Sequence, residues 1–206
     1  MCPNAVVEGY HILEIEAMQR GYVRIIAGKW RGRRLKVPDV QDLRPTPDRV
    51  RETLFNWLSL LLPGARCLDL FAGSGILGFE ALSRGALRVV MVDQSPEVIK
   101  TLKEEAVGFG ADNVIIYRAN VPTQLQTVEQ PFDIVFLDPP YTGGLLLPIC
   151  SYLEEHHFLA DQAYIYLESQ QAIESSHLPA NWQIVKSGKA GQVFYHLAHR
   201  ESDNAK

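Results

Sequence analysis

The chain has 206 residues, of which 47% are hydrophobic, and its formal net charge at pH 7 is −4. This length and composition indicate one globular domain with a sizeable core. No apolar run approaches the roughly 20 residues of a membrane-spanning helix. The cysteines, Cys2, Cys67 and Cys150, form neither a C-x-x-C pair nor a metal-ligand spacing. We therefore expect a protein of the reducing cytoplasm, with no membrane span, no disulfide scaffold and no metal.

The charge is distributed unevenly along the chain. Residues 20–52 hold ten of the twenty Lys and Arg but only four Asp and Glu, which leaves −10 on the remainder. A basic segment on an acidic body predicts that a polyanion docks at one place. Its clustering with Trp30 and the glycines favours nucleic acid over a merely solvated loop. The candidate contacts are Lys29, Trp30, Arg31, Arg33, Arg34, Arg44 and Arg49.

The first elements form a small basic unit over residues 23–62. Residues 1–22 are weakly patterned, and we interpret them as an extension. Residues 24–37 predict two short strands around a Gly-bounded turn, with one apolar and one basic face. Trp30 in that turn either stacks on a nucleobase or anchors the turn.

A helix follows this hairpin. Thr46 can be its N-cap, Pro47 its first residue, and Asp48 an acid at the positive end of its dipole. Apolar residues recur at helical spacing from Val50 onward and should face the core. Arg51, with Arg44 and Arg49, is expected at the helix start or on its exposed side.

Residues 63–200 alternate between strand and helix patterns. Strands are predicted at residues 67–70, 88–92, 114–117, 132–137, 163–168, 182–186 and 192–198, and helices at 76–83, 95–107, 121–128 and 144–155. This order predicts a doubly wound, mostly parallel α/β sheet with right-handed crossovers and an antiparallel hairpin at one edge. Residues 201–206 are read as a tail.

The strand of residues 132–137 carries the main motif at its end. Two prolines stop it, so Asp138 lies at the carboxyl end of the strand, where open α/β sheets bind ligands. Asp138 and the backbone of Pro139 and Pro140 offer acceptors, and Tyr141 offers an aromatic ring. This set suits a planar, amine-bearing base, because the ring stacks on it and the acceptors take its amino hydrogens.

A glycine loop is the second motif. Gly73-x-Gly75-x-x-Gly78, with Asp93 twenty residues after Gly73, matches the dinucleotide fingerprint, so a nicotinamide oxidoreductase is one alternative. Three features oppose it. Asp69 would crowd a pyrophosphate, the glycines fall past the strand instead of starting the helix directly, and the Asp-Pro-Pro-Tyr segment has no role in hydride transfer.

A cofactor with an amino-acid head, a sulfonium and a nucleoside fits these residues better. Asp69 would face its ammonium group, and Gly73 and Gly75 would let the backbone approach closely, because a Cβ there would collide. Asp93 would accept both ribose hydroxyls, since a carboxylate has two acceptor oxygens. Asn120 either bonds the adenine amine or is only a turn residue.

Four motifs occur together in the order RIIAGKWRGRRL, RPTPDRVRETLFNWL, LDLFAGSGILGFEALSRGA and LDPPY. Over Arg24 to Ala198 the chain resembles the bacterial 16S ribosomal RNA guanine-N2 methyltransferases, a family of class I S-adenosylmethionine-dependent methyltransferases with a Rossmann-like seven-stranded sheet. The resemblance implies methyl transfer from S-adenosylmethionine to N2 of a guanine in small-subunit ribosomal RNA, by a monomer acting on a partly or fully assembled subunit.

The same resemblance implies roles for individual residues. The cofactor would contact Asp69, Phe71, Gly73, Gly75, Asp93, Gln94, Asn120, Pro45 and Thr46, and the base would contact Asp138, Pro139, Pro140 and Tyr141. Asn120 stands where the family has Asp, which predicts weaker adenine recognition. Family members begin at the position of Val23, a residue that an alternative start codon can encode, so residues 1–22 are expected to precede the native start.

Two further alternatives remain open. An adenine-N6 DNA methyltransferase shares the Asp-Pro-Pro-Tyr chemistry, but the sheet and helices use all 65 residues between Gly73 and Asp138, which leaves no target-recognition domain. A non-catalytic RNA-binding assembly factor is the other. The complete set of catalytic residues argues against it.

Overall fold

A computed structural model describes residues 21–40, 46–126, 130–140 and 144–202 of the chain. The N-terminal extension before residue 21 lies outside these ranges, as do Arg44, Pro45 and Tyr141 among the predicted site residues. The predictions made for them therefore stay predictions.

A seven-stranded sheet forms the centre of the molecule, with the strand order β5-β4-β3-β6-β7-β9-β8. Its strands are β3 (Arg66–Asp69), β4 (Arg88–Asp93), β5 (Val114–Arg118), β6 (Phe132–Leu137), β7 (Leu159–Ser169), β8 (Trp182–Ala190) and β9 (Val193–Glu201). The first five pair in parallel, and β9 pairs antiparallel with both β7 and β8. The predicted α/β sheet with an antiparallel edge hairpin is confirmed.

Helices cover both faces of the sheet and bury two hydrophobic clusters. Helices α2 (Asp48–Trp57), α3 (Ile76–Ser83) and α4 (Pro96–Phe109) pack on one face, and α5 (Leu146–Glu155) packs on the other. A short 3₁₀ helix, η1 (Ser175–His177), precedes β8. Within the described ranges, no helix is long and apolar enough to cross a membrane.

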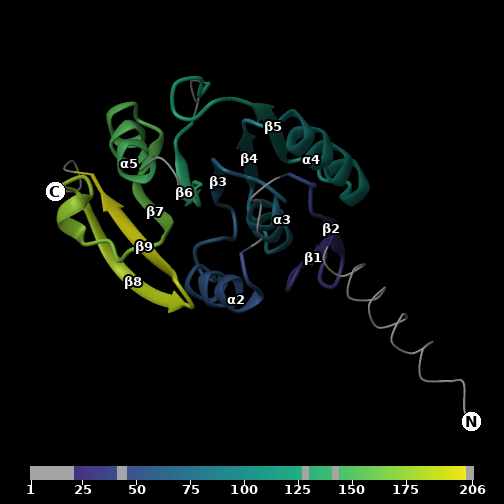
Figure 1. Ribbon diagram of the computed structural model, residues 1–206, viewed down its shortest axis with the longest axis horizontal. Coiled ribbons are helices and arrows are strands. Elements are labelled where there is room, and N and C mark those ends of the chain that lie inside the picture. Colours follow the sequence, from purple (N-terminus) through teal and green to yellow (C-terminus); the bar gives the residue numbers. More distant parts are fainter. Residues whose placement is uncertain (1–20, 41–45, 127–129, 141–143, 203–206) are drawn as a thin grey trace, which may run out of the picture.

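The small N-terminal hairpin pairs β1 (Tyr22–Arg24) with β2 (Arg34–Lys36). Val23 and Leu35 face each other across it and are buried, whereas the neighbouring cations are exposed, as the alternation predicts. The hairpin lies beside α3 and α4, at the opposite side of the molecule from β8 and β9 (Figure 1). Lys36 N–H, for example, donates to a carboxylate oxygen of Glu105 in α4 at 3.0 Å.

Two local predictions are wrong. Helix α2 begins one residue late, at Asp48, so Pro47 occupies the capping position and Thr46 makes no capping bond. The helix expected at residues 121–128 is not formed over its described part, where residues 121–124 make a turn and Asn120 N–H donates to the Gln124 side-chain oxygen at 3.0 Å. Residues 127 and 128 lie outside the described ranges. The predicted Ser95 cap of α4 is correct, because its side chain accepts from Val98 N–H at 3.3 Å.

The role of Gly75 also differs from the prediction. This glycine is the N-cap of α3, so the glycine loop does start the helix directly, and that argument against a dinucleotide site fails. Its φ is +75°, which favours glycine. A Cβ at this position would meet Leu102 at 2.4 Å and Phe79 at 2.9 Å, so core side chains already require a glycine here.

Candidate active site

Four acidic residues end the parallel strands at one edge of the sheet. Asp69 ends β3, Asp93 ends β4, Asp138 follows β6, and Glu168 is the penultimate residue of β7. Because the strands are parallel and adjacent in the order β4-β3-β6-β7, their carboxyl ends meet at this edge. Glu168 was missed in the sequence, although its pattern of an apolar strand ending in an acid repeats that of Asp138.

Asp69 is a buried carboxylate with one unpartnered oxygen. Asp69 is 3% exposed, and its Oδ2 atom is buried without a hydrogen-bond partner. Burial raises the pKa of Asp69 to about 7, and the charge of Asp93 adds to this, whereas backbone N–H groups of Gly78 and Phe71 lower it. A buried oxygen of this kind needs a donor, and a cationic ligand group would supply one.

Asp93 organises the glycine loop. Its Oδ2 accepts the Gly73 N–H at 3.0 Å, and its Oδ1 accepts the Ser95 N–H at 2.9 Å. Asp93 therefore fixes the loop after β3 against the loop after β4. A carboxylate has about four lone-pair positions, so two acceptor directions remain for ligand hydroxyls.

Asp138 lies between the other acids. It is partly exposed, and Pro139, which follows it, is buried, whereas Pro140 is exposed. Burial raises the pKa of Asp138 well above its usual range, and the charges of Glu168 and Asp69 raise it further. The fold thus gathers carboxyl groups around Asp138, whose oxygens suit hydrogen-bond donors on a ligand.

The remaining predicted cofactor contacts lie on loops at the same edge. Phe71 is half-buried in the turn after Asp69, and Gln94 and Asn120 are exposed after β4 and β5. Gln94 also accepts from the Arg118 side chain through its backbone oxygen at 2.8 Å. The fold thus brings these residues to the edge that carries the acids.

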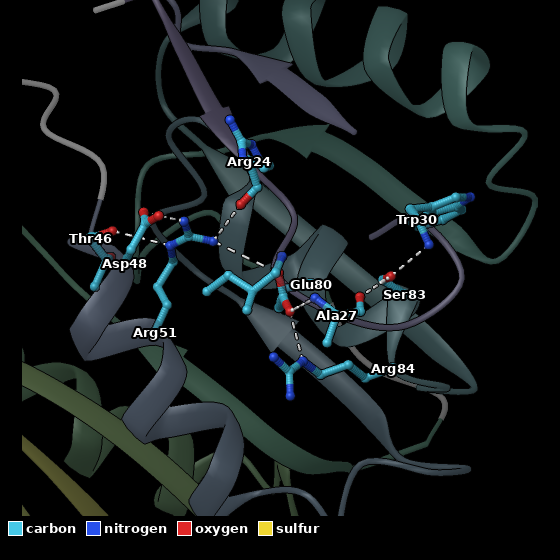
Figure 2. A network of polar contacts seen from close by, with 10 residues as sticks. Arg24, Ala27, Trp30, Thr46, Asp48, Arg51, Glu80, Ser83 and Arg84 are labelled. Atoms are coloured by element: carbon cyan, nitrogen blue, oxygen red, sulfur yellow. Dashed lines mark hydrogen bonds and ion pairs between the residues drawn. The ribbon is translucent and has the colours of Figure 1, made fainter. Parts of the chain in front are cut away.

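Thr46 is held by Arg51, which was expected at the start of α2 or on its exposed side. Arg51 lies in the first turn of α2, but it is fully buried and not exposed, and polar partners surround its guanidinium (Figure 2). It donates to the backbone oxygens of Thr46 at 3.2 Å and Arg24 at 2.9 Å, and to the Asp48 carboxylate at 2.6 Å.

Glu80 of α3 joins this network to the hairpin. Its carboxylate is fully buried and lies 3.8 Å from Arg51 and 2.7 Å from Arg84 (Figure 2). It also accepts the backbone N–H groups of Ile26 and Ala27 at 2.7 and 3.0 Å. Three hydrogen-bond donors and the nearby Arg51 guanidinium compensate its buried charge and link the hairpin to α2 and α3.

The predicted nucleic-acid contacts divide into an anchor and exposed cations. Trp30 is 6% exposed, its backbone N–H donates to Ser83 Oγ at 3.0 Å, and its ring contacts Phe79 and Phe109. A ring buried in this way anchors the turn and has no free face for a base. The other candidates in the described ranges are exposed cations: Lys29, Arg31, Arg33, Arg34 and Arg49.

The position of the basic loop is unexpected. Its residues bond to Ser83 and Gly108, at the C-terminal ends of α3 and α4. Both helices run back from the carboxyl edge of the sheet, so these ends lie toward the opposite edge. A separate hollow of about 300 Å³ lies between the hairpin and α2. It is lined by Tyr22, Val23, Arg24, Arg34 and Asp48.

Comparison with known proteins agrees with this architecture. The model of a family described as conserved hypothetical protein 95 matches residues 23–199. The chain belongs to this family.

Among the described residues, no cluster of His, Cys, Asp or Glu could hold a metal ion.

Relatives of this family member include proteins named ribosomal RNA small subunit methyltransferase D. The Escherichia coli K12 protein is 46% identical over 182 residues, which cover 88% of this chain and 92% of that protein. The Haemophilus influenzae protein is 42% identical, with coverages of 86% and 94%. The solved structure of yhhF from Escherichia coli, described as a putative methyltransferase, superposes with a TM-score of 0.81 at 44% identity, and the match covers 89% of this chain and 100% of that one. The predicted methyltransferase fold is confirmed.

Proposed function

We propose that this protein methylates the exocyclic N2 of a guanine in small-subunit ribosomal RNA, in the cytoplasm, with S-adenosylmethionine as methyl donor. The observation that carries the proposal is the row of acids at the carboxyl edge, in a chain 46% identical to a ribosomal RNA small subunit methyltransferase. The names of the relatives support the RNA substrate. The choice of guanine N2 rests on the sequence resemblance.

The residues at the ends of β3 and β4 fit the methyl donor, which supplies an electrophilic methyl group on a sulfonium. The unpartnered oxygen of Asp69 suits its ammonium group, and the remaining lone pairs of Asp93 suit its ribose hydroxyls. Asn120, exposed on the loop after β5, would bond the adenine amine, and Gln94, exposed after β4, would also contact the cofactor. The orphaned buried oxygen is the structural observation that favours a cationic ligand.

Asp138 would act on the target base. The nitrogen of a guanine amine is a poor nucleophile because its lone pair is delocalised into the ring. The Asp138 carboxylate and the backbone oxygen of Pro139 would accept the two N2–H bonds and turn the lone pair toward the methyl group. Tyr141, by the family resemblance, would stack on the extruded base. Orientation would then provide most of the acceleration.

Replacement of Asp138 tests this assignment. Asp138→Ala should reduce methyl transfer to small-subunit RNA by at least about 100-fold, since both orientation and an acceptor are lost. The affinity for S-adenosylmethionine should stay within a few-fold of wild type. Radioactive methyl transfer and calorimetry measure the two quantities. Turnover within a few-fold of wild type would reject the role of Asp138.

The methylated nucleoside identifies the acceptor atom. Digestion of the product RNA followed by chromatography and mass spectrometry should yield N2-methylguanosine. N6-methyladenosine in its place would support the adenine alternative, and no methylated nucleoside with free RNA or isolated subunits would support an assembly factor.

A further inference from the structure

The order of the strands divides the carboxyl edge of the sheet into two halves. The residues proposed for the methyl donor end β3 and β4 or follow β5, and these three strands lie on one side of β6. Asp138 follows β6, so it lies at the boundary between the halves. Strands β7, β9 and β8 form the other half. An RNA that presents a base to Asp138 therefore has this second half available for its neighbouring nucleotides.

A hollow of about 340 Å³ opens on the second half of the edge. It is lined by Gln170, Gln171, Lys189, Gln192 and Phe194. The first two directly follow β7, which runs parallel to β6, and the other three belong to the end of β8, the turn after it and the start of β9. Because β9 is the second strand from β6, the two strands lie about 10 Å apart. The hollow is thus close to the end of β6 but separate from the row of acids.

The pairing of the strands brings an aromatic ring and a cation together in this hollow. Phe194 is the cross-strand partner of Ser169 on β7 and of Lys189 on β8, so the three residues form one row on one face of the sheet. The Lys189 ammonium lies 4.5 Å from the centre of the Phe194 ring. This cation–π contact is weaker than base stacking, and Lys189 is exposed. The lysine can therefore turn to a phosphate and leave the ring to a base.

The loop that carries two of the glutamines is fixed against the β8–β9 hairpin. Ser169 Oγ donates to the backbone oxygen of Gln171 at 2.5 Å, and Ile173 N–H donates to His196 Nε2 at 3.3 Å. Because Nε2 accepts this bond, neutral His196 carries its proton on Nδ1, which lies 2.8 Å from Ser187 Oγ. These bonds preorganise one wall of the hollow.

The lining groups match the parts of a nucleotide. An aromatic ring stacks on a base of any identity, a glutamine amide offers one acceptor and two donors to the edge of the base, and an ammonium group binds a phosphate. None of the five lining residues is acidic, whereas Asp69 and Asp93 lie on the other half of the edge. The charge at the hollow therefore favours a polyanion.

We propose that this hollow binds an unpaired nucleotide of the substrate RNA next to the target guanine. Phe194 stacks on its base, the three glutamines contact the edge of that base, and Lys189 binds its phosphate. The inference rests on the proposed function. None of the lining residues belongs to the basic segment of residues 20–52, so the hollow is a second RNA contact.

Two substitutions of Phe194 test the stacking. Methyl transfer to small ribosomal subunits from a strain that lacks this protein gives KM and kcat. Phe194→Leu, which keeps an apolar side chain but has no ring, should raise KM for the subunits at least about 5-fold. It should leave kcat within about 2-fold, because the stack is the same in the ground state and the transition state. Phe194→Tyr keeps the ring and should keep KM within about 2-fold of wild type.

The salt dependence of subunit binding tests the phosphate contact. Lys189→Ala should reduce the slope of log affinity against log salt by about 0.7–1, since one phosphate contact is lost. Lys103→Ala, at an exposed position of α4, is the matched control and should keep the slope. Calorimetry should show that all these variants bind S-adenosylmethionine as wild type does, because the donor residues lie on the other half of the edge.

A wild-type KM in Phe194→Leu or a wild-type salt slope in Lys189→Ala would overturn the inference. Equal rises of KM in Phe194→Leu and Phe194→Tyr would also overturn it, because they would assign the ring to packing of the hairpin. Failure of the proposed function looks different, because wild type would then methylate no RNA guanine, or Asp138→Ala would stay active. The affinities of wild type and variants for the subunits would still decide whether the hollow binds RNA.

Discussion

At the scale of single residues, Asp69 is the clearest case of a group whose environment conflicts with its own charge. It lies in a strand that is buried on both faces, and one of its oxygens lacks a donor. Burial disfavours the ionised form, which explains a pKa of about 7. A carboxylate kept in such a site without a donor is typical of a binding position that a ligand completes.

This environment predicts pH-dependent cofactor binding. Because a cationic ligand selects the ionised form of Asp69, the affinity for S-adenosylmethionine should fall by up to tenfold per pH unit below about pH 7. Asp69→Asn should weaken binding at least about 10-fold and remove this dependence. Calorimetry at several pH values measures both effects. Asp39→Asn, at an exposed position, is the control, and an unchanged pH dependence in Asp69→Asn would contradict the assignment.

At the scale of elements, the hairpin loop is fitted against the end of α3. Gly28 has φ +81°, and a Cβ on it would lie 1.8 Å from the backbone oxygen of Ser83. The same loop is joined to α3 by Lys29 N–H, which donates to Ser83 O at 2.8 Å. The hairpin can therefore pack against α3 only if position 28 has no side chain. The atom that a Cβ would meet is a backbone oxygen, which cannot move aside as a flexible side chain can.

Two glycine variants distinguish the cost of the collision with Ser83 from the cost of the left-handed backbone. Gly32, in the same loop, has φ +82° and open space around its Cβ position. Gly32→Ala should cost only about 1–2 kcal/mol for the left-handed backbone. Gly28→Ala should cost an additional 1–3 kcal/mol or so for the collision. Urea unfolding measures both free energies of unfolding, and equal losses would show that the Ser83 contact adjusts freely.

At the scale of the whole molecule, the basic segment and the acidic edge occupy different places. Arg33 donates to Gly108 O at 2.6 Å and lies over the Phe109 ring at the end of α4, a helix of 14 residues and thus about 21 Å long. Asp138 lies at the edge where such helices begin. An RNA that reaches the active site and also contacts this loop must therefore extend along the flank formed by the hairpin.

The salt dependence of RNA binding tests this surface. Arg31 and Arg34 are exposed, whereas Arg33 also packs against α4, so the first two can be replaced without loss of that contact. Arg31→Ala combined with Arg34→Ala should reduce the slope of log affinity against log salt by about 1–2. Lys100→Ala with Lys103→Ala, exposed on α4, is the control. An unchanged slope would place the RNA elsewhere.

The sequence by itself determined the order of strands and helices, the parallel sheet and the acids at strand ends. These follow from local periodicity, proline stops and capping, all of which act over a few residues. Asp69, Asp93 and Asp138 could be located in this way because a residue that ends a parallel strand must reach the carboxyl edge.

Only the tertiary structure decided the roles that depend on distant partners. The sequence left Trp30 open between a base contact and an anchor, and Arg51 open between the helix start and its exposed side. Both are buried, because Glu80 and Ser83, about 30 and 50 residues further along the chain, supply their partners. Glu168 ends an apolar strand as Asp138 does, but its place next to the strand of Asp138 follows only from the pairing of β7 with β6. Burial and electrostatic coupling depend on which elements become neighbours in space, and no local pattern contains that information.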